Sequence, residues 1–189
     1  MSDIFVDNIK HQSSQGSGTI TVGASGETVA PASGVMTKLG VFENQLLHVR
    51  DEKANDTDGG TFTSGDWRTR DLNTIKTNEI TNASLSSNQI TLPSGTYYID
   101  AFAPVYNVQR HQTALYNITD SAFQIIGTSE YIVGSVNKSF VKGRFTISAQ
   151  KTFELQHRCT NTESGDGLGV KTNFSQVCVY SEAQIWRIA

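Results

Sequence analysis

The sequence of 189 residues is short of charged residues, which make up 17% of the chain. A globular domain usually contains about 25%. The formal net charge is −3, and the lysines and arginines are scattered along the chain. The sequence therefore lacks the basic footprint of a nucleic-acid-binding protein. Disordered chains usually combine high net charge with few aromatic residues, so this composition predicts a folded protein that does not bind nucleic acid.

Long apolar runs are also missing. No stretch approaches the roughly 20 apolar residues that a membrane-spanning helix needs. The first five residues, Met-Ser-Asp-Ile-Phe, lack the basic and apolar regions of a signal peptide. We therefore expect no membrane insertion, and a protein that is made in a cytoplasm and either released there or built into a particle.

Cysteine is nearly absent, with only Cys159 and Cys178. One pair is too few for a disulfide scaffold, and a domain of this size does not need one. We expect two reduced, half-buried thiols on neighbouring strands near the C-terminus. A disulfide between the two residues is the alternative.

The most informative stretch of the chain is residues 89–102. Ile90 and Leu92 alternate with polar neighbours, which is the pattern of a half-buried strand. Pro93-Ser94-Gly95 then turns the chain, because proline presets the first turn dihedral and glycine accepts a positive φ. Residues 96–99 are β-branched and aromatic, with high strand preference. We predict a hairpin, with two strands joined by a tight turn.

Within the second strand, Tyr97 and Ile99 are expected to face opposite to Tyr98. Pro104 is expected to end this strand, because proline cannot donate to a central ladder. Alternation resumes over residues 105–118.

Strand patterns recur along most of the remaining chain, and no helical period of 3.6 residues appears. Residues 46–50 are expected to form the first strand of the main domain. Residues 74–87 are interpreted as a loop with one short strand, and residues 127–130 as a loop. Gly143 is interpreted as a bulge within a strand. Eight to ten strands with turns between them predict an all-β fold, a jelly-roll β-sandwich over residues 41–189.

Residues 1–40 form a separate, β-rich N-terminal arm. Its strand-like pieces are too short to bury a core of their own. They carry apolar residues at alternating positions, which favours a segment that docks on a partner or forms a short stalk. A flexible linker is the alternative.

Residues 92–99, preceded by Trp67 and the region of Asn73, resemble the core of the trimeric jelly roll in the complement-globular-head and tumour-necrosis-factor-like superfamily. In that family a Pro-x-Gly-x-Tyr-x-Phe-like step joins two inner strands. This chain has Ile99 where the family has phenylalanine. Further stretches that fall where the family has strands are residues 143–145 and 185–188.

Over nearly its full length the chain resembles tail-fibre or virion-surface proteins of bacteriophages, particularly marine ones. The matching stretches are residues 2–9, 23–28 and 155–159. The resemblance implies a homotrimer with no enzymatic activity and no cofactor. It also implies a location in the virion, with residues 1–40 contacting other virion proteins. We expect the exposed loops 51–60, 127–138 and 160–176 to contact a host-surface receptor, for which a polysaccharide is a plausible candidate.

Two rival functions remain open at this stage. A capsid decoration protein would share the fold, but its loops need bind nothing. A carbohydrate-active enzyme on a jelly-roll scaffold would instead show acidic residues converging in a groove. Their spacing is set by the fold and is invisible in the sequence.

Three sets of residues are weak candidates for a site. Asp56-Thr57-Asp58-Gly59 resembles part of a calcium loop, with Glu52, Asp56 and Asp58 as ligands, but Ala54 stands where an acidic residue is needed. A turn stabilised by the aspartates is the favoured interpretation. His48, His111 and His157 show no metal-ligand spacing. Tyr106 and Tyr131 lie near predicted loops and are the candidates for stacking on sugars.

Overall fold

The computed structural model describes residues 45–188, and the predicted N-terminal arm, residues 1–40, lies outside them. Eleven strands follow one another along the described chain: β1 (Gln45–Lys53), β2 (Arg68–Thr69), β3 (Thr74–Asn78), β4 (Ser84–Ser86), β5 (Gln89–Leu92), β6 (Gly95–Tyr106), β7 (Gln109–Asn117), β8 (Ala122–Ile132), β9 (Val136–Ile147), β10 (Lys151–Cys159) and β11 (Cys178–Arg187). Residues 45–188 include no helix with the length and apolar character needed to cross a membrane.

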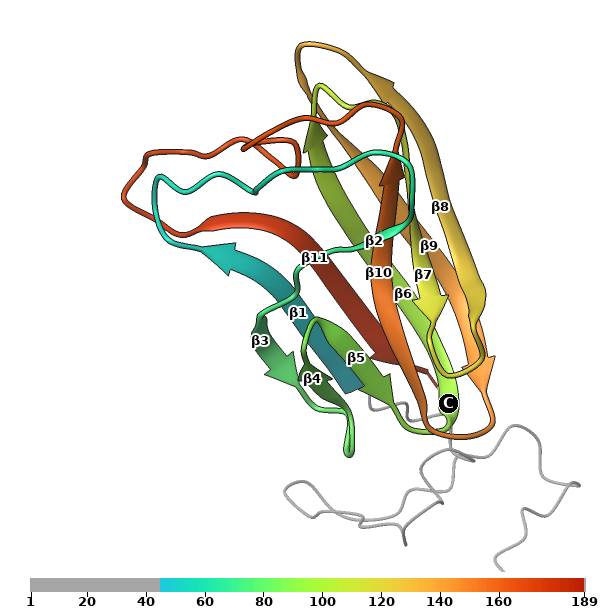
Figure 1. Cartoon of the computed structure of the whole chain (residues 1–189). Coiled ribbons are helices and arrows are strands. Elements are labelled where there is room, and N and C mark those ends of the chain that lie inside the picture. The colour runs from blue at the N-terminus through green and yellow to red at the C-terminus, as the bar shows by residue number, and fades with distance from the viewer. Residues whose placement is uncertain (1–44, 189) are drawn as a thin grey trace, which may run out of the picture. The chain divides into compact units, whose positions relative to one another are not determined.

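The strands form two sheets that pack face to face (Figure 1). The first sheet has the order β3-β1-β11-β6-β9, and the second has the order β4-β5-β10-β7-β8, with β2 also paired to β10. All strand pairs are antiparallel. The prediction of an all-β jelly-roll sandwich is confirmed.

The predicted turn at residues 93–95 joins the two sheets instead of closing a hairpin. β5 pairs with β10 in the second sheet, whereas β6 pairs with β11 and β9 in the first. The Tyr97 hydroxyl donates to the Pro93 carbonyl at 2.8 Å and holds this crossing. Tyr97 and Ile99 are buried and Tyr98 is exposed, as their alternation predicted. A turn signal indicates that the chain reverses, but it does not say which sheet the chain enters next.

Pro104 does not end its strand, and that prediction is wrong. β6 continues to Tyr106, paired throughout with β9. Its pairing with β11 stops at Phe102. Beyond that point β6 has one neighbour instead of two, so a residue without an N–H fits in the strand.

Three further predictions, for residues 74–87, residues 127–130 and Gly143, are wrong. Residues 74–87 form two strands, β3 and β4, and residues 127–130 lie within β8. The glycine that suggested a loop there permits close approach, since a β-carbon on Gly127 would lie 2.4 Å from the Phe140 carbonyl oxygen. Gly143 forms no bulge, because β6 and β9 stay in register past it.

Both cysteines are free and buried, which confirms the interpretation as unpaired thiols. They do not lie on neighbouring strands. Cys159 ends β10 in the second sheet, and Cys178 begins β11 in the first.

The core between the sheets differs from one end to the other. At the apolar end, around β5 and the start of β6, the buried side chains form one large hydrophobic cluster. Its members are Leu47, Val49, Leu72, Ile80, Ala83, Ile90, Leu92, Tyr97, Ile99, Ala101, Ala103, Leu115, Val141, Phe145, Ile147, Phe153, Leu155, Ala183 and Ile185.

At the other end, near the loop 160–177, polar groups share the core with a small cluster of Phe62, Val105, Val108 and Cys159. We call this region the polar end; its buried polar side chains are Arg70, His111, Thr113, Ser139 and His157.

Candidate functional site

Arg70 is the largest fully buried side chain of the described chain, only 1% exposed. Its guanidinium donates to the Pro104 carbonyl at 3.2 Å and to the Leu168 carbonyl at 2.8 Å. Burial lowers its pKa to about 10, and Asp51 and Asp71 oppose that shift, so Arg70 is charged at neutral pH. Arg70 thus connects the β2 segment to β6 and to the loop 160–177, a structural role.

A pair of histidines lies beside Arg70. His111 Nδ1 and His157 Nε2 are 3.0 Å apart, and both residues are buried. Burial lowers the pKa of His111 to about 4, and burial together with the charge of Arg70 lowers the pKa of His157 well below its ordinary value. The pair is therefore neutral at physiological pH, and one ring donates to the other.

The histidines do not form a metal site with His48, which lies in the first sheet against Glu182, at 3.5 Å. Among residues 45–188 no group of three or more histidines, cysteines or acidic residues is placed to hold a metal ion.

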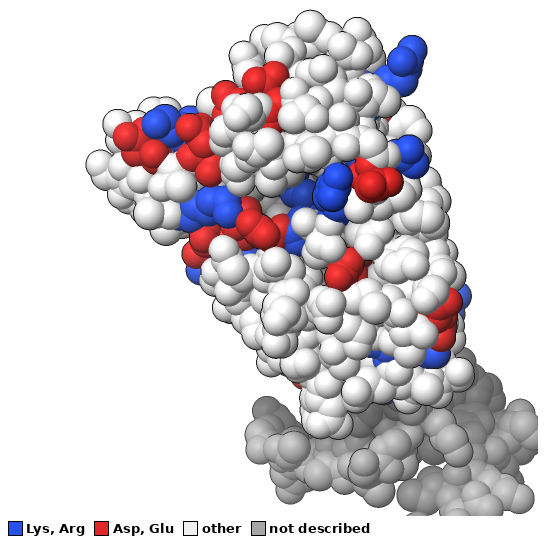
Figure 2. Space-filling model, viewed as in Figure 1, with Lys and Arg blue, Asp and Glu red and all other residues white. Residues whose placement is uncertain are grey.

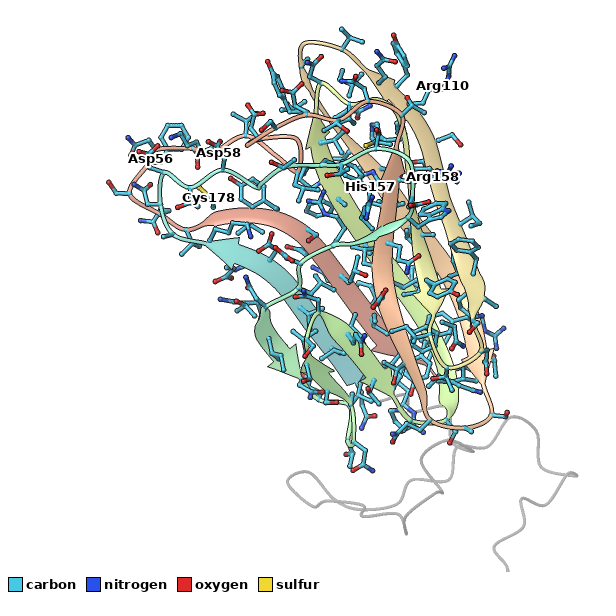
Figure 3. The ribbon with its side chains drawn as sticks, in the orientation of Figure 1. Asp56, Asp58, Arg110, His157, Arg158 and Cys178 are labelled. Carbon is cyan, nitrogen blue, oxygen red and sulfur yellow. The ribbon has the colours of Figure 1, made fainter. Side chains whose placement is uncertain are left out.

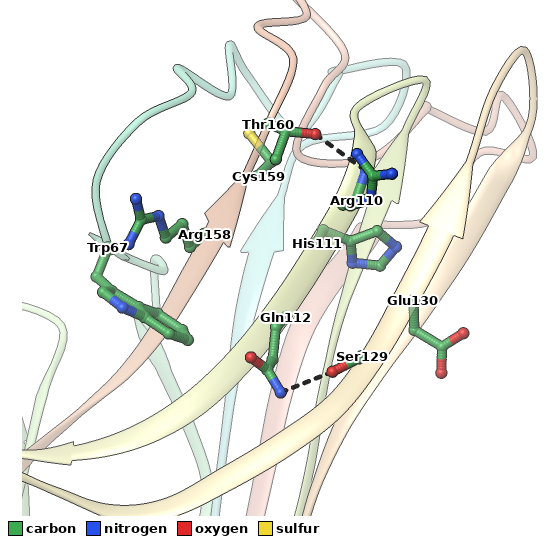
Figure 4. Close-up of a pocket in the computed structure, with 9 residues that line it drawn as sticks. All are labelled: Trp67, Arg110, His111, Gln112, Ser129, Glu130, Arg158, Cys159 and Thr160. Carbon is green, nitrogen blue, oxygen red and sulfur yellow. Dashed lines mark hydrogen bonds between the residues drawn. The ribbon is translucent and has the colours of Figure 1, made fainter.

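A surface groove lies on the outer face of the second sheet, above β10, β7 and β8 (Figure 4). Its volume is about 280 Å³. We call it the arginine groove; the side chains that give it its chemistry are Trp67, Arg110, Gln112, Ser129, Arg158 and Thr160.

Strand pairing explains why these side chains meet. Arg158, Gln112 and Ser129 stand opposite one another across β10, β7 and β8, and Thr160 follows beside Arg110. Gln112 donates to the Ser129 hydroxyl at 2.9 Å, and the Thr160 hydroxyl accepts from the Arg110 backbone at 3.2 Å. These bonds fix the polar groups of the groove before any ligand arrives.

The outer face of the first sheet carries apolar side chains over several strands, whereas the large exposed ones of the second sheet, such as Phe123 and Ile126, lie on its edge strand β8. Along β6, β9 and β11 the first sheet carries large apolar side chains, among them Tyr98, Phe102, Phe140 and Trp186. Val136 is 56% exposed. A hollow of about 550 Å³ lies between Phe102, Phe140, Val170 and Val179. We call this surface the apolar face.

Some of the charges on the apolar face are matched within it, although Arg144 on β9 has no ion-pair partner among the described residues. Lys142 and Asp100 form an ion pair at 2.8 Å, and His48 lies against Glu182. The ammonium group of Lys138 lies 4.1 Å from the centre of the Phe102 ring. Paired charges and cation–π contacts reduce the cost of covering such a surface.

The suggested calcium ligands are not brought together as a metal site. Asp56 and Asp58 lie at the tip of the loop region, far from Arg110 and Arg158 (Figure 3). Both face Lys171, at 3.2 and 3.9 Å. Glu52 accepts from Arg50 and pairs with Lys76 at 3.2 Å. Each carboxylate already has a cationic partner.

The two tyrosines proposed for sugar stacking lie on different sheets. Tyr131 is 60% exposed on β8 and stands opposite Arg110, at the border of the arginine groove. Tyr106 ends β6 beside Val136, on the first sheet. The structure does not bring them together, and their contact with sugars stays a prediction.

The groove residues Trp67, Arg110 and Arg158 were missed as a site by sequence reasoning. One signal was present, since alternation over residues 105–118 places Arg110 and Gln112 together on the face opposite His111. The partner strands that bring Arg158 and Ser129 beside them come from distant parts of the chain, so the full set appears only in the fold.

Comparisons with known proteins bear on the fold. No protein-family model matches the chain, and no curated protein matches it either. Among solved structures it is similar to murine APRIL in crystal structures at pH 5.0 and pH 8.5, with TM-scores of 0.52 and 0.51, 6% and 7% identity, and coverage of 77% of this chain and 100% of that chain. The globular domain of zebrafish complement 1qA matches with a TM-score of 0.45 and 13% identity, over 78% of this chain and 98% of that domain. At so low an identity the likeness to APRIL shows the fold alone, and the described chain is a jelly-roll sandwich.

Proposed function

We propose that this protein is a non-enzymatic structural protein of a bacteriophage particle, a homotrimer of the tail or tail fibre that contacts the host surface. The observation that carries the trimer is the apolar face. Soluble monomers rarely expose a broad apolar surface unless it mediates an interaction. We assign two further copies of the same chain as the partners that cover the apolar face.

Several features support self-association over binding of a small ligand. The hollow on this face is bordered by valine side chains and by the aromatic rings of Phe102, Phe140 and Tyr180, and aromatic residues are enriched at interface centres. Aromatic side chains are also the usual anchors of binding energy. The first sheet is wide and continuous here, which suits a partner of similar size.

The phage assignment rests on the sequence resemblance described above, and the attachment role of residues 1–40 rests on the same basis. A trimer suits host attachment because three weak contacts held rigidly together gain avidity. Capsid decoration uses the same fold and differs in location. The catalytic alternative requires converging carboxylates, and the arginine groove is lined by one carboxylic acid, Glu130.

Solution mass tests the assembly. The intact protein is expected to show three times the mass of its 20.6 kDa chain in light scattering after gel filtration. Tyr98→Arg places a new cation on the apolar face, and we expect it to shift the protein to a monomer of unchanged circular dichroism. Phe174→Arg, at an aromatic residue 78% exposed in the loop 160–177, is the matched control and should stay trimeric. A monomeric wild-type protein would overturn the proposal.

Location tests the biological role. Antibodies against the purified protein, visualised on intact particles by electron microscopy, should label the tail. Labelling distributed over the capsid would favour the decoration protein instead, and absence from particles would contradict a virion role altogether.

A further inference from the structure

We propose that the arginine groove binds acidic sugar residues of a polysaccharide, with Arg110 and Arg158 supplying the positive charge that attracts the anionic group and Trp67 lying against the ring. This inference rests on the proposed contact with a host surface and assigns to it a place and a ligand chemistry. The groove lies on the second sheet, away from the apolar face, so trimer formation through the first sheet leaves it available.

The positive charge of the groove favours an anionic ligand. Among the described residues, neither Arg110 nor Arg158 forms an ion pair. Lys53, Lys142 and Lys151 do form ion pairs. Several described cations outside the groove form none either, among them Arg68, Lys138, Arg144 and Arg187, so the groove is distinguished by having two such arginines at one site. The planar guanidinium presents a fork of donors that matches a carboxylate or a sulfate. The two arginines border the same groove from β7 and β10 (Figure 4).

The one carboxylic acid of the groove does not cancel this charge. Glu130 stands opposite His111, whose side chain points into the core. Its carboxylate accepts from Asn137 at 3.3 Å. Glu130 therefore lies on the inner side of β8, whereas the arginines lie on the outer side.

The uncharged groups of the groove fit sugar hydroxyls. The Gln112 amide nitrogen is occupied by Gly127 and Ser129, which leaves its oxygen free to accept. The hydroxyls of Ser129 and Thr160 act as acceptors within the protein, so each retains a hydrogen to donate. An acidic sugar has hydroxyls and one anionic group. The donors and acceptors of the groove can bind the hydroxyls, and the neighbouring cations can bind the anionic group.

Trp67 supplies the apolar surface. Its ring packs against Phe123 with centroids 4.9 Å apart, which fixes its orientation. It is half-buried, so part of the ring stays accessible at the side of the groove. A fixed aromatic ring beside hydrogen-bonding groups gives contact area with little loss of side-chain entropy on binding.

The volume of the groove and the net charge of the chain limit which ligands fit. The volume of about 280 Å³ is at the lower limit of pockets that enclose a whole small molecule, so the groove fits one unit of a longer polymer. Nucleic acid is disfavoured, because the chain has a net charge of −3 and the visible surface has no extended basic patch (Figure 2).

Binding of defined polymers to the immobilised full chain tests the inference. Polygalacturonate provides carboxylates, dextran sulfate provides sulfates, and dextran is the neutral control. We expect binding to at least one acidic polymer, weakening as salt rises, and none to dextran. Comparing polygalacturonate with dextran sulfate shows whether the groove prefers a carboxylate or a sulfate. Polyglutamate bound as tightly as the acidic sugars would overturn the assignment to a saccharide, and binding to none of the polymers would overturn the site.

Matched variants place the binding in the groove. Arg158→Ala and Trp67→Ala should each weaken binding at least tenfold. Lys171→Ala removes the same charge near Asp56, and Phe174→Ala removes an exposed aromatic ring, and both should bind as the wild type does. Equal losses in the control variants would contradict the site.

Measuring the oligomeric state of each protein by light scattering distinguishes failure of the groove proposal from failure of the trimer proposal. A trimer that binds no acidic polymer refutes the groove alone. A monomer that binds, with loss in Arg158→Ala, refutes the trimer alone.

Discussion

The two ends of the core are built from different chemistry between the same two sheets. The apolar end contains leucine, isoleucine, phenylalanine and tyrosine side chains in one cluster. The polar end buries an arginine, two histidines, a threonine and a serine. Apolar burial gains about 25 cal/mol for each Å² removed from water, whereas a buried polar group only offsets its desolvation when it is hydrogen-bonded. The apolar end therefore holds the sandwich together.

The polar end instead supports the surfaces that we propose for function. His157 and His111 lie on β10 and β7 next to Arg158 and Arg110, and their side chains are on the opposite, inner face of the same strands. Arg70 ties the loop 160–177 to β6, and that loop contributes Val170 to the hollow of the apolar face. Specific polar contacts fix these positions. They add little to the stability of the fold, which comes mainly from the apolar end.

The largest expected effect is a truncation at the apolar end. Phe153 is fully buried and meets Phe145 edge-on at 5.5 Å. Phe153→Ala should lower the free energy of unfolding by about 3–5 kcal/mol, because the cavity adds to the lost burial. Urea denaturation measures it. Phe174→Ala, at an exposed site, should change stability by less than about 0.5 kcal/mol; a similar loss there would mean that the apolar end is not where stability is concentrated.

The next effect is a dependence of stability on pH at the polar end. An unfolded histidine takes up a proton near pH 6.5, whereas His111 in the fold stays neutral until about pH 4. Below pH 6.5 the unfolded chain therefore binds more protons, so stability falls as pH falls, by about 1.4 kcal/mol for each pH unit and each such histidine. Between pH 7 and pH 5 we expect a loss of about 2 kcal/mol from His111, increased by His157.

Urea denaturation at pH 7, 6 and 5 checks this slope. The double variant His111→Gln/His157→Gln should flatten it, whatever its stability at pH 7. His48→Gln, which changes a histidine outside the core, is the control variant for the loss of a histidine. A slope unaffected by the double variant would show that other groups cause the loss.

The sequence predicted the apolar end better than the polar end. Alternation identified the inward residues of β5 and separated the two faces of β6 and β7, because a buried face imposes a period of two along each strand. The partners of each strand remained hidden, so β5 and β6 were expected to form a hairpin and instead lie in different sheets. The same limit applies to the arginine groove, which combines side chains from strands that are distant in sequence. Trp67, Arg110 and Arg158 each resemble ordinary surface residues until the sheet places them together.

The smallest effect concerns one hydroxyl at the polar end. Ser139 on β9 accepts from the Thr113 backbone at 2.9 Å and donates to the Thr128 carbonyl at 2.7 Å, so it connects both sheets where β8 approaches β9. Ser139→Ala leaves a buried N–H without this partner, which should cost about 1–2 kcal/mol. Ser84→Ala, on exposed β4, is the matched control and should be nearly neutral. If Ser139→Ala were equally neutral in urea denaturation, the hydroxyl would contribute nothing net, and the polar end would owe its order to Arg70 and the histidine pair alone.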